Sequence, residues 1–378
     1  MPNEIAARID AWLARCAEPQ SQPLQGMAEA ELLLPADNYR DIALTKAALV
    51  ERTGRPGIAG VWGGRQVAAR WFIAGFGNEA QRAAWLARAV AVAISEPRVG
   101  AHPKLLTTRA EADGDGFCIT GEKAWVSNGP LADIFVVLAI TAEDGGRKRY
   151  SALLVPRDAP GVTLKEMPAF HALQPSQHCG LVLDGVRVPR AALLGPEGSA
   201  YELMALPFRD VEDAVGVFSL LGVFCFLRRR LVGGEANADG ALSLGAITAL
   251  TAVFGEAAMA VVSALDEGAL GAKAAALSGL HLLAADILQR VRAHQGRFGP
   301  ADDAAVEALL ADLDVLLGVA KGPAAGAAAP AGRRLTCACG GGGGGFPSGP
   351  PLSLGASHLD LSRFAGEVYS AREVFEFS

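Results

Sequence analysis

The sequence predicts an α+β fold in three parts: an N-terminal α-helical domain, a middle antiparallel β domain and a C-terminal α-helical bundle. Apolar residues recur at three- and four-residue spacing up to about residue 90 and again from about residue 200, which is typical of helices that bury one face. Between these regions, short β-branched runs alternate with turn signals, which is typical of strands. The chain has 378 residues, of which 51% are hydrophobic and 20% charged, enough apolar material for more than one core.

We expect four segments along the chain. They are an N-terminal helical domain over residues 1–90, a β domain over 91–199, a C-terminal helical domain over 200–320, and a divergent tail rich in Gly and Pro over 321–378. The first helix is expected within residues 1–16, because apolar side chains there fall on one face.

The glycine-rich stretch from Gly54 to Gly64 is expected to be a loop between two helices. In the β region, Leu105–Ala112 is predicted as one strand and Phe117–Ser127 as its return strand. Between them, Asp113-Gly114-Asp115-Gly116 is typical of a hairpin turn in which glycine supplies positive φ. Further strands are expected over residues 135–140, 152–155 and 180–183.

Charge and cysteine usage narrow the class of protein. The net charge of -6 and a pI near 5.6 argue against an electrostatic nucleic-acid binder. Six scattered cysteines without a CxxC pattern are expected to be reduced, as in a cytoplasmic protein. Two uncharged apolar runs, residues 214–227 and 240–255, are shorter than the roughly 18–20 residues that span a bilayer and are expected to be buried helices.

Five ordered blocks between residues 77 and 195 resemble the acyl-CoA dehydrogenase family. They include Ile94-Ser95-Glu96-Pro97, the stretch from Thr120 to Gly129 with its Gly-Glu-Lys-Ala-Trp-Val-Ser sequence, and Leu183-Asp184-Gly185-Val186-Arg187-Val188-Pro189. The other two blocks cover residues 77–82 and 108–116. The resemblance implies that the chain binds FAD and desaturates an acyl-CoA, with loss of a proton from Cα and transfer of a hydride from Cβ to flavin N5.

The resemblance also assigns cofactor-binding residues. Ser95 would hydrogen-bond the pyrimidine side of the flavin ring, Trp125 would pack on the ring, and Ser127 would reach toward N5. Serine keeps the hydroxyl that threonine usually supplies at both positions. An ordinary half-buried strand aromatic is the alternative for Trp125.

Two positions depart from the family pattern in the substrate loop. Ala101 stands where the family places a substrate-binding hydroxyl, and His102 stands where it places an acid. The remaining histidines show no metal-ligand spacing and are expected at surface or loop positions: His171, His178, His281, His294 and His358.

The sequence leaves three possibilities for the catalytic base: Glu367, Glu212, or neither of them. Glu367 lies 21 residues after Phe346, near the spacing of one family arrangement. Glu212 lies ten residues before Gly222, the spacing of the other arrangement. Each is otherwise a solvated carboxylate, Glu212 in a helix turn and Glu367 in the tail.

The resemblance implies a homodimer or homotetramer, because family members complete the FAD site with a neighbouring chain. It also implies an electron acceptor such as an electron-transfer flavoprotein. The family's Arg-x-x-Phe-Gly motif is missing from its usual place, and the tract Gly340 to Gly345 is either a linker or a backbone approach to a pyrophosphate. Two alternatives therefore remain: a catalytically silent partner subunit of a hetero-oligomer, and a flavin-dependent oxidase or monooxygenase on the same fold.

Overall fold

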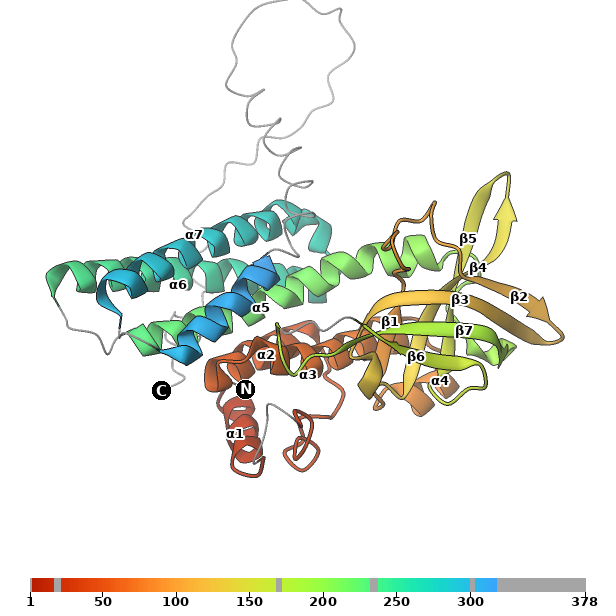
Figure 1. Cartoon of the computed structure of the whole chain (residues 1–378), viewed down its shortest axis with the longest axis horizontal. Coiled ribbons are helices and arrows are strands. Elements are labelled where there is room, and N and C mark those ends of the chain that lie inside the picture. Colours follow the sequence, from red (N-terminus) through yellow and green to blue (C-terminus); the bar gives the residue numbers. More distant parts are fainter. Residues whose placement is uncertain (1, 17–21, 168–171, 232–236, 300–302, 318–378) are drawn as a thin grey trace, which may run out of the picture.

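The structure is a computed structural model that describes residues 2–16, 22–167, 172–231, 237–299 and 303–317. Helices come first, then a sheet, then long helices, so the α+β class is confirmed (Figure 1). The predicted tail and its candidate base Glu367 lie outside the described residues.

The described residues of the N-terminal part form four helices and a π-helical turn, η1 (Ala69–Ala74). The helices are α1 (Pro2–Leu13), α2 (Tyr39–Thr53), α3 (Pro56–Ala68) and α4 (Glu79–Trp85). Ile9 and Trp12 of α1 are fully buried, as the apolar spacing predicts. Helix α4 begins at a capping box in which Asn78 and Gln81 satisfy each other's backbone N–H groups.

The predicted loop from Gly54 to Gly64 is wrong from residue 56 onward, because α3 occupies that stretch. Two of its glycines allow close packing that a larger residue would prevent. A Cβ on Gly57 would lie 2.0 Å from the carbonyl oxygen of Leu173, and one on Gly63 would lie 2.6 Å from Cδ of Lys46. Tertiary packing therefore outweighs the low helix propensity of glycine here.

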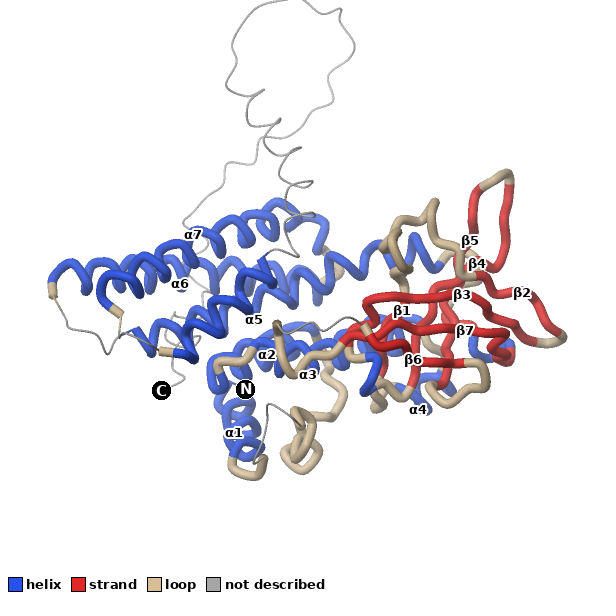
Figure 2. Tube along the Cα trace, in the orientation of Figure 1, coloured by secondary structure: helices blue, strands red, loops and turns tan. Residues whose placement is uncertain are grey.

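The described residues form one sheet of eight strands, drawn red in Figure 2. The strands are β1 (Val90–Ala93), β2 (Arg109–Asp113), β3 (Gly116–Ser127), β4 (Ile134–Asp144), β5 (Arg147–Pro156), β6 (Val162–Glu166), β7 (His178–Pro189) and β8 (Leu193–Leu194). Their order is β6-β7-β3-β2-β4-β5-β8, and β1 pairs with β4. Most pairs are antiparallel as predicted, but β1 and β2 each run parallel to β4, so the sheet is mixed.

The strand predicted over Leu105–Ala112 begins only at Arg109, although the hairpin turn after it is confirmed with Gly114 at φ +60. The backbone N–H groups of Thr107 and Thr108 donate to the carboxylate of Glu96. Because these backbone N–H groups donate to a side chain, they do not pair with a neighbouring strand, and residues 105–108 form a loop.

The C-terminal part consists of long helices. They are α5 (Leu206–Leu231), α6 (Ala238–Asp266), α7 (Ala274–Phe298) and a helix over residues 304–317, with two short turns, η4 (Tyr201–Ala205) and η5 (Leu270–Lys273). Helix α5 lies between the N-terminal helices and the α6–α7 pair (Figure 1). A Cβ on Gly222 of α5 would lie 2.3 Å from the carbonyl oxygen of Ala47, so α5 and α2 approach closely at that point.

The apolar run in α5 is largely buried, as predicted, but the run in α6 is only partly so. Leu242 and Val253 of α6 are 74% and 55% exposed. Two described stretches, Ala238–Asp266 and Leu270–Phe298, are long and apolar enough to cross a membrane by length and composition. Core helices pass the same test, so this is weak support for a membrane span.

Candidate active site

A cavity of about 300 Å³ opens where α3, β1, the end of β3 and the start of α5 meet. Every candidate site residue within the described chain lines it: Ser95, Ala101, Trp125, Ser127 and Glu212. The structure thus brings together residues that are up to 117 positions apart in the sequence, from Ser95 to Glu212. The rest of the wall is mainly apolar and includes Ala68, Ala91, Val92, Ile94, Leu206 and Phe208.

Trp125 reaches the cavity because β3 is irregular at this point. The β3–β7 register shifts between Lys123 and Val126, and Trp125 itself has φ +57. Such a bulge turns a side chain away from its regular alternation, and positive φ in a bulky residue is strained. The indole is 54% exposed in a residue type that is usually well covered. The strained backbone therefore presents an open aromatic surface to a ligand.

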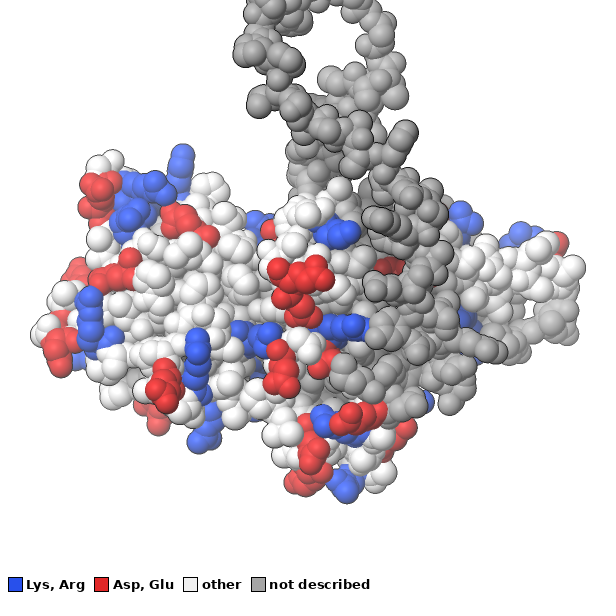
Figure 3. Space-filling model, turned by 180° about the vertical axis from the view of Figure 1, so that it is seen from behind, with Lys and Arg blue, Asp and Glu red and all other residues white. Residues whose placement is uncertain are grey.

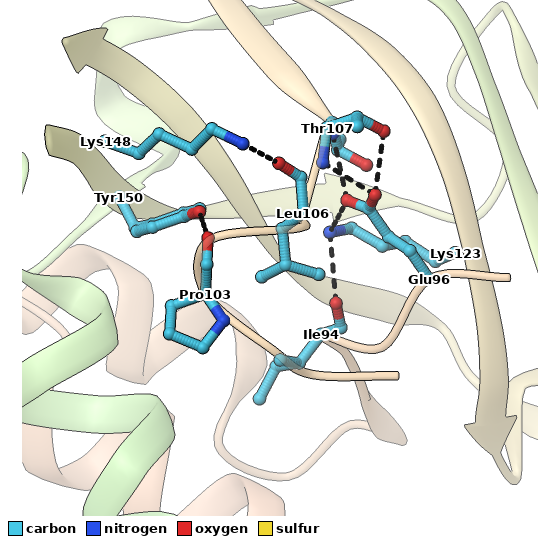
Figure 4. Close-up of polar contacts among 9 residues, drawn as sticks. Ile94, Glu96, Pro103, Leu106, Thr107, Lys123, Lys148 and Tyr150 are labelled. Atoms are coloured by element: carbon cyan, nitrogen blue, oxygen red, sulfur yellow. Dashed lines mark hydrogen bonds and ion pairs between the residues drawn. The ribbon is translucent and has the colours of Figure 1, made fainter. Parts of the chain in front are cut away.

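Ser95 lies in the chain between Ile94 and Glu96, both of which contact Lys123 in a buried cluster (Figure 4). The Nζ atom of Lys123 donates to Glu96 Oε1 at 3.0 Å and to the Ile94 carbonyl oxygen at 3.2 Å. Both side chains are almost completely buried, with 0% and 3% of their surface exposed. The Ser95 carbonyl oxygen also accepts the N–H of Ala124 at 2.8 Å. These contacts fix Ser95 against the end of β3.

The carboxylate of Glu96 is the centre of this cluster. Oε2 accepts both the backbone N–H and the hydroxyl of Thr107, and Oε1 accepts the backbone N–H of Thr108. Burial raises the pKa of Glu96, but the charge of Lys123 and the hydrogen bonds outweigh it and lower that pKa to about 2. Glu96 is therefore ionised throughout the physiological range.

The loop that carries Ala101 is tied to β5 on its far side. The hydroxyl of Tyr150 donates to the Pro103 carbonyl oxygen, and Nζ of Lys148 donates to the Leu106 carbonyl oxygen at 2.7 Å (Figure 4). Ala101 lines the cavity with a methyl group, so this position offers no hydroxyl group to a ligand. Exposed His102 follows it on the same loop.

Glu212 lines the cavity from α5. Phe208, Arg209 and Glu212 share this side of the helix because their spacing of three and four residues matches the helical turn. Glu212 is exposed at the cavity, although many protein atoms lie around its carboxylate. Their desolvation of the charged form raises its pKa to about 7, with a further contribution from the charge of Asp213. A carboxyl group with this pKa is suited to exchange a proton near neutral pH.

A partly buried cation lies near Glu212. Lys46 of α2 packs its stem against Gly63, and its charge lowers the pKa of Glu212 against the effect of burial. Burial in turn lowers the pKa of Lys46 to about 8. The sequence does not predict that Lys46 lies near Glu212. Lys46 is an isolated charge in an amphipathic helix, and its distance from Glu212 depends on how α2 and α5 pack.

His178 was expected at a surface or loop position, and the structure places it instead as the first residue of β7. Its Nδ1 lies 3.2 Å from Oγ of Ser127, and its ring meets that of Trp125 edge-on at 6.0 Å between centroids. His178 is partly exposed, whereas His294 of α7 is buried, at 3% exposure. His178 belongs to the site through cross-strand pairing with Ser127, which no local motif reveals.

The residues present suit a flavin ring. An open indole surface, two hydroxyl groups and an apolar wall stand around one cavity, which is the donor set and shape that a flat, partly polar heterocycle needs. Ser95, Trp125 and Ser127 are the residues that would hold it.

Comparison with known proteins places the β domain in a family. The family model for the acyl-CoA dehydrogenase middle domain matches residues 91–186. Over 127 residues the chain is 33% identical to cyclohexane-1-carbonyl-CoA dehydrogenase of Syntrophus aciditrophicus, covering 34% of this chain and 33% of that protein. Over 134 residues it is 33% identical to the bovine mitochondrial short-chain specific acyl-CoA dehydrogenase, covering 34% of this chain and 32% of that protein. The alignments thus span about a third of the length of these relatives.

Two solved structures share the fold over most of the described chain. Butyryl-CoA dehydrogenase from Megasphaera elsdenii superposes with a TM-score of 0.72 at 18% identity, covering 83% of this chain and 92% of that one. Glutaryl-CoA dehydrogenase from Mycobacterium smegmatis, in complex with FADH2, gives 0.69 at 22% identity, covering 84% and 89%. Residues 91–186 therefore belong to the acyl-CoA dehydrogenase middle-domain family, and the chain as a whole has the fold of the acyl-CoA dehydrogenases.

Proposed function

We propose that this protein is an FAD-dependent acyl-CoA dehydrogenase in which Glu212 is the catalytic base. The observation that carries the proposal is that the Glu212 carboxylate, with its pKa raised to about 7, lines the same cavity as Ser95, Trp125 and Ser127. Glu367, the other candidate base, lies outside the described residues.

Glu212 accepts the proton from Cα of the acyl thioester, and the electron pair of that C–H bond forms the Cα=Cβ double bond. FAD, when bound, supplies the acceptor for the hydride that leaves Cβ. Ser95 and Trp125 orient the cofactor, and the apolar wall of Ala91, Val92 and Phe208 holds the acyl chain and excludes water. Glu212 keeps the proton as a neutral carboxyl group, the form that its raised pKa favours.

A hollow that contains basic side chains lies beside the cavity and is the proposed binding site for the phosphates of coenzyme A. Tyr201 lines both the cavity and a neighbouring hollow of about 520 Å³ that also contains Lys104, Arg147, Lys148 and Glu202. Glu202 forms an ion pair with Arg147 at 2.8 Å, so Lys104 and Lys148 are the cations that would complement a phosphate-bearing substrate. Because Lys104 lies on the exposed loop after Ala101, Lys104→Met is expected to raise KM for an acyl-CoA and leave kcat nearly unchanged.

A second copy of the chain is the proposed partner of the exposed apolar side of α6, where Leu242 and Val253 lie. This fits the homodimer or homotetramer, or a homologous partner subunit, that the family resemblance implies. An electron-transfer flavoprotein is the proposed electron acceptor and the cytoplasm the proposed location. Sedimentation of the purified protein tests the assembly, and a strictly monomeric protein would contradict it.

The experiment that tests the function starts from the full-length protein reconstituted with FAD. A panel of acyl-CoAs is added without oxygen, and loss of the yellow flavin absorbance is followed. We expect bleaching by at least one acyl-CoA. A colourless protein that no added FAD restores would instead favour the silent partner subunit. A protein that retains FAD but is bleached by none of the acyl-CoAs would favour the alternative that it is a flavin-dependent oxidase or monooxygenase.

A further inference from the structure

His178 contacts two residues that the family resemblance assigns to the flavin. It pairs with Ser127 in the register of β3 and β7, which brings Nδ1 to 3.2 Å from the Ser127 hydroxyl oxygen. The same ring meets Trp125 at 6.0 Å and an interplanar angle of 67°. One imidazole therefore supports both a hydroxyl and an aromatic ring at the cavity.

The hydroxyl of Ser127 has one proton, and the tautomer of His178 determines whether that proton is donated to His178 or to a ligand. Burial lowers the pKa of His178, so its ring is neutral at physiological pH, with one nitrogen as donor and the other as acceptor. If Nδ1 is the acceptor, Ser127 donates to it and offers only its oxygen lone pairs to a ligand. If Nδ1 carries the proton, Ser127 accepts that hydrogen bond and donates its own proton to the ligand.

We propose that His178 is a positioning residue for FAD, whose Nδ1 orients the Ser127 hydroxyl so that it can serve either redox state of the flavin. The oxidised ring nitrogen toward which the resemblance directs Ser127 is an acceptor, and the reduced one carries a hydrogen and is a donor. The two neutral tautomers of His178 match these two needs. This inference rests on the proposed function, since it requires that the cavity bind FAD.

The test measures the Kd of FAD with the full-length protein after the cofactor has been removed. His178→Phe keeps an aromatic ring beside Trp125 and removes the nitrogen, so Kd is expected to rise about fivefold to tenfold, as for one lost hydrogen bond. His178→Asn places an amide that can donate or accept near the position of Nδ1 and is expected to stay within about twofold of the wild type. If the Phe variant does not fold, His178→Leu provides the same comparison.

A double-mutant cycle separates action through Ser127 from a packing role. Ser127→Ala alone is expected to raise Kd, and adding His178→Phe to it is expected to change Kd by less than about twofold. The midpoint potential of bound FAD is the second readout. It is expected to move in His178→Phe, to return in His178→Asn, and to be insensitive to His178 in the Ser127→Ala background.

The outcomes distinguish the inference from the proposed function. Equal effects of His178→Phe in the two backgrounds, or no effect in the wild type, would overturn the inference alone. A wild-type protein that binds no FAD would overturn the proposed function and this inference with it. Thermal unfolding of each apo-protein checks that the variants are folded.

Discussion

Nζ of Lys123 lies 3.0 Å from Oε1 of Glu96, and both side chains are almost completely buried. The pair joins the segment after β1 to the middle of β3; Ser95 directly precedes Glu96, and Trp125 lies two residues after Lys123. A buried ion pair contributes little net stability compared with apolar residues, but removing one member leaves an uncompensated charge. The pair therefore holds the cavity wall in one arrangement.

Lys123→Met is expected to lower the free energy of unfolding by about 3–5 kcal/mol, because it leaves the Glu96 carboxylate buried without its cation. Urea denaturation of the apo-protein measures this. Lys165→Met is the matched control, since Lys165 forms an ion pair with Glu122 in which both side chains are well exposed, at 61% and 40%. That variant is expected to lose less than about 1 kcal/mol. Similar losses in both variants would contradict the role of the buried pair.

Acid should weaken the fold through Glu96. Its pKa is about 2 in the folded protein against an ordinary value of 4.5, so the folded state favours the ionised form. The stability that this provides is present above 4.5 and is lost as the pH falls toward about 2. Urea unfolding at a series of acidic pH values is expected to show this decline, and a smaller slope is expected in Glu96→Gln. An identical slope in that variant would argue against Glu96 as its source.

Gly57→Ala is expected to destabilise the protein by about 1–3 kcal/mol, because the new methyl group would meet the backbone of Leu173 and Gln174. Gly216→Ala in α5 is the control, since nothing lies within 4 Å of its Cβ position. There the gain in helix propensity is expected to raise stability by about 0.5–1 kcal/mol. Thermal unfolding distinguishes the two, and a neutral Gly57→Ala would show that the contact is not tight.

The middle of the chain could be predicted from sequence because its signals are local. The strands of the β domain are short apolar and β-branched runs between turn signals, and the turn at Gly114 has a glycine at positive φ. Likewise Ser95, Trp125 and Ser127 could be assigned because each lies within an ordered block of the family resemblance. That resemblance depends on short stretches in which neighbouring residues act together.

The remaining features depend on contacts between distant parts of the chain. The glycine-rich sequence does not predict helix α3. Gly57 and Gly63 are required there because they pack closely against Leu173 and Lys46, which lie elsewhere in the chain. The late start of β2 follows from the carboxylate of Glu96, eleven residues before Thr107. Lys46 and His178 join the site through helix packing and strand register, neither of which a single local pattern specifies.

Glu212→Gln is expected to slow flavin reduction by an acyl-CoA about 10²- to 10⁴-fold, because the amide cannot take the α-proton. FAD affinity is expected to stay within about twofold. Asp210→Asn, two positions earlier on α5, is the control and is expected to keep nearly full activity. Unchanged reduction in Glu212→Gln would exclude Glu212 as the base and direct attention to Glu367.

The reduction rate should rise with pH around the pKa of Glu212, about 7, since only the ionised form accepts a proton. Lys46→Met removes the positive charge that lowers this pKa. The midpoint of the pH profile is therefore expected to move upward by about 1 in that variant. Stopped-flow reduction across a pH series measures it, with Lys165→Met as the charge-matched control. A profile unaffected by Lys46→Met would show that the two groups do not interact.

Anaerobic titration of the FAD-loaded protein with acyl-CoAs of different chain lengths tests the central claim most directly. We expect the yellow absorbance to bleach with at least one of them and an enoyl-CoA to appear in equal amount. Full FAD loading without bleaching by any acyl-CoA, under conditions in which dithionite reduces the flavin, would contradict it.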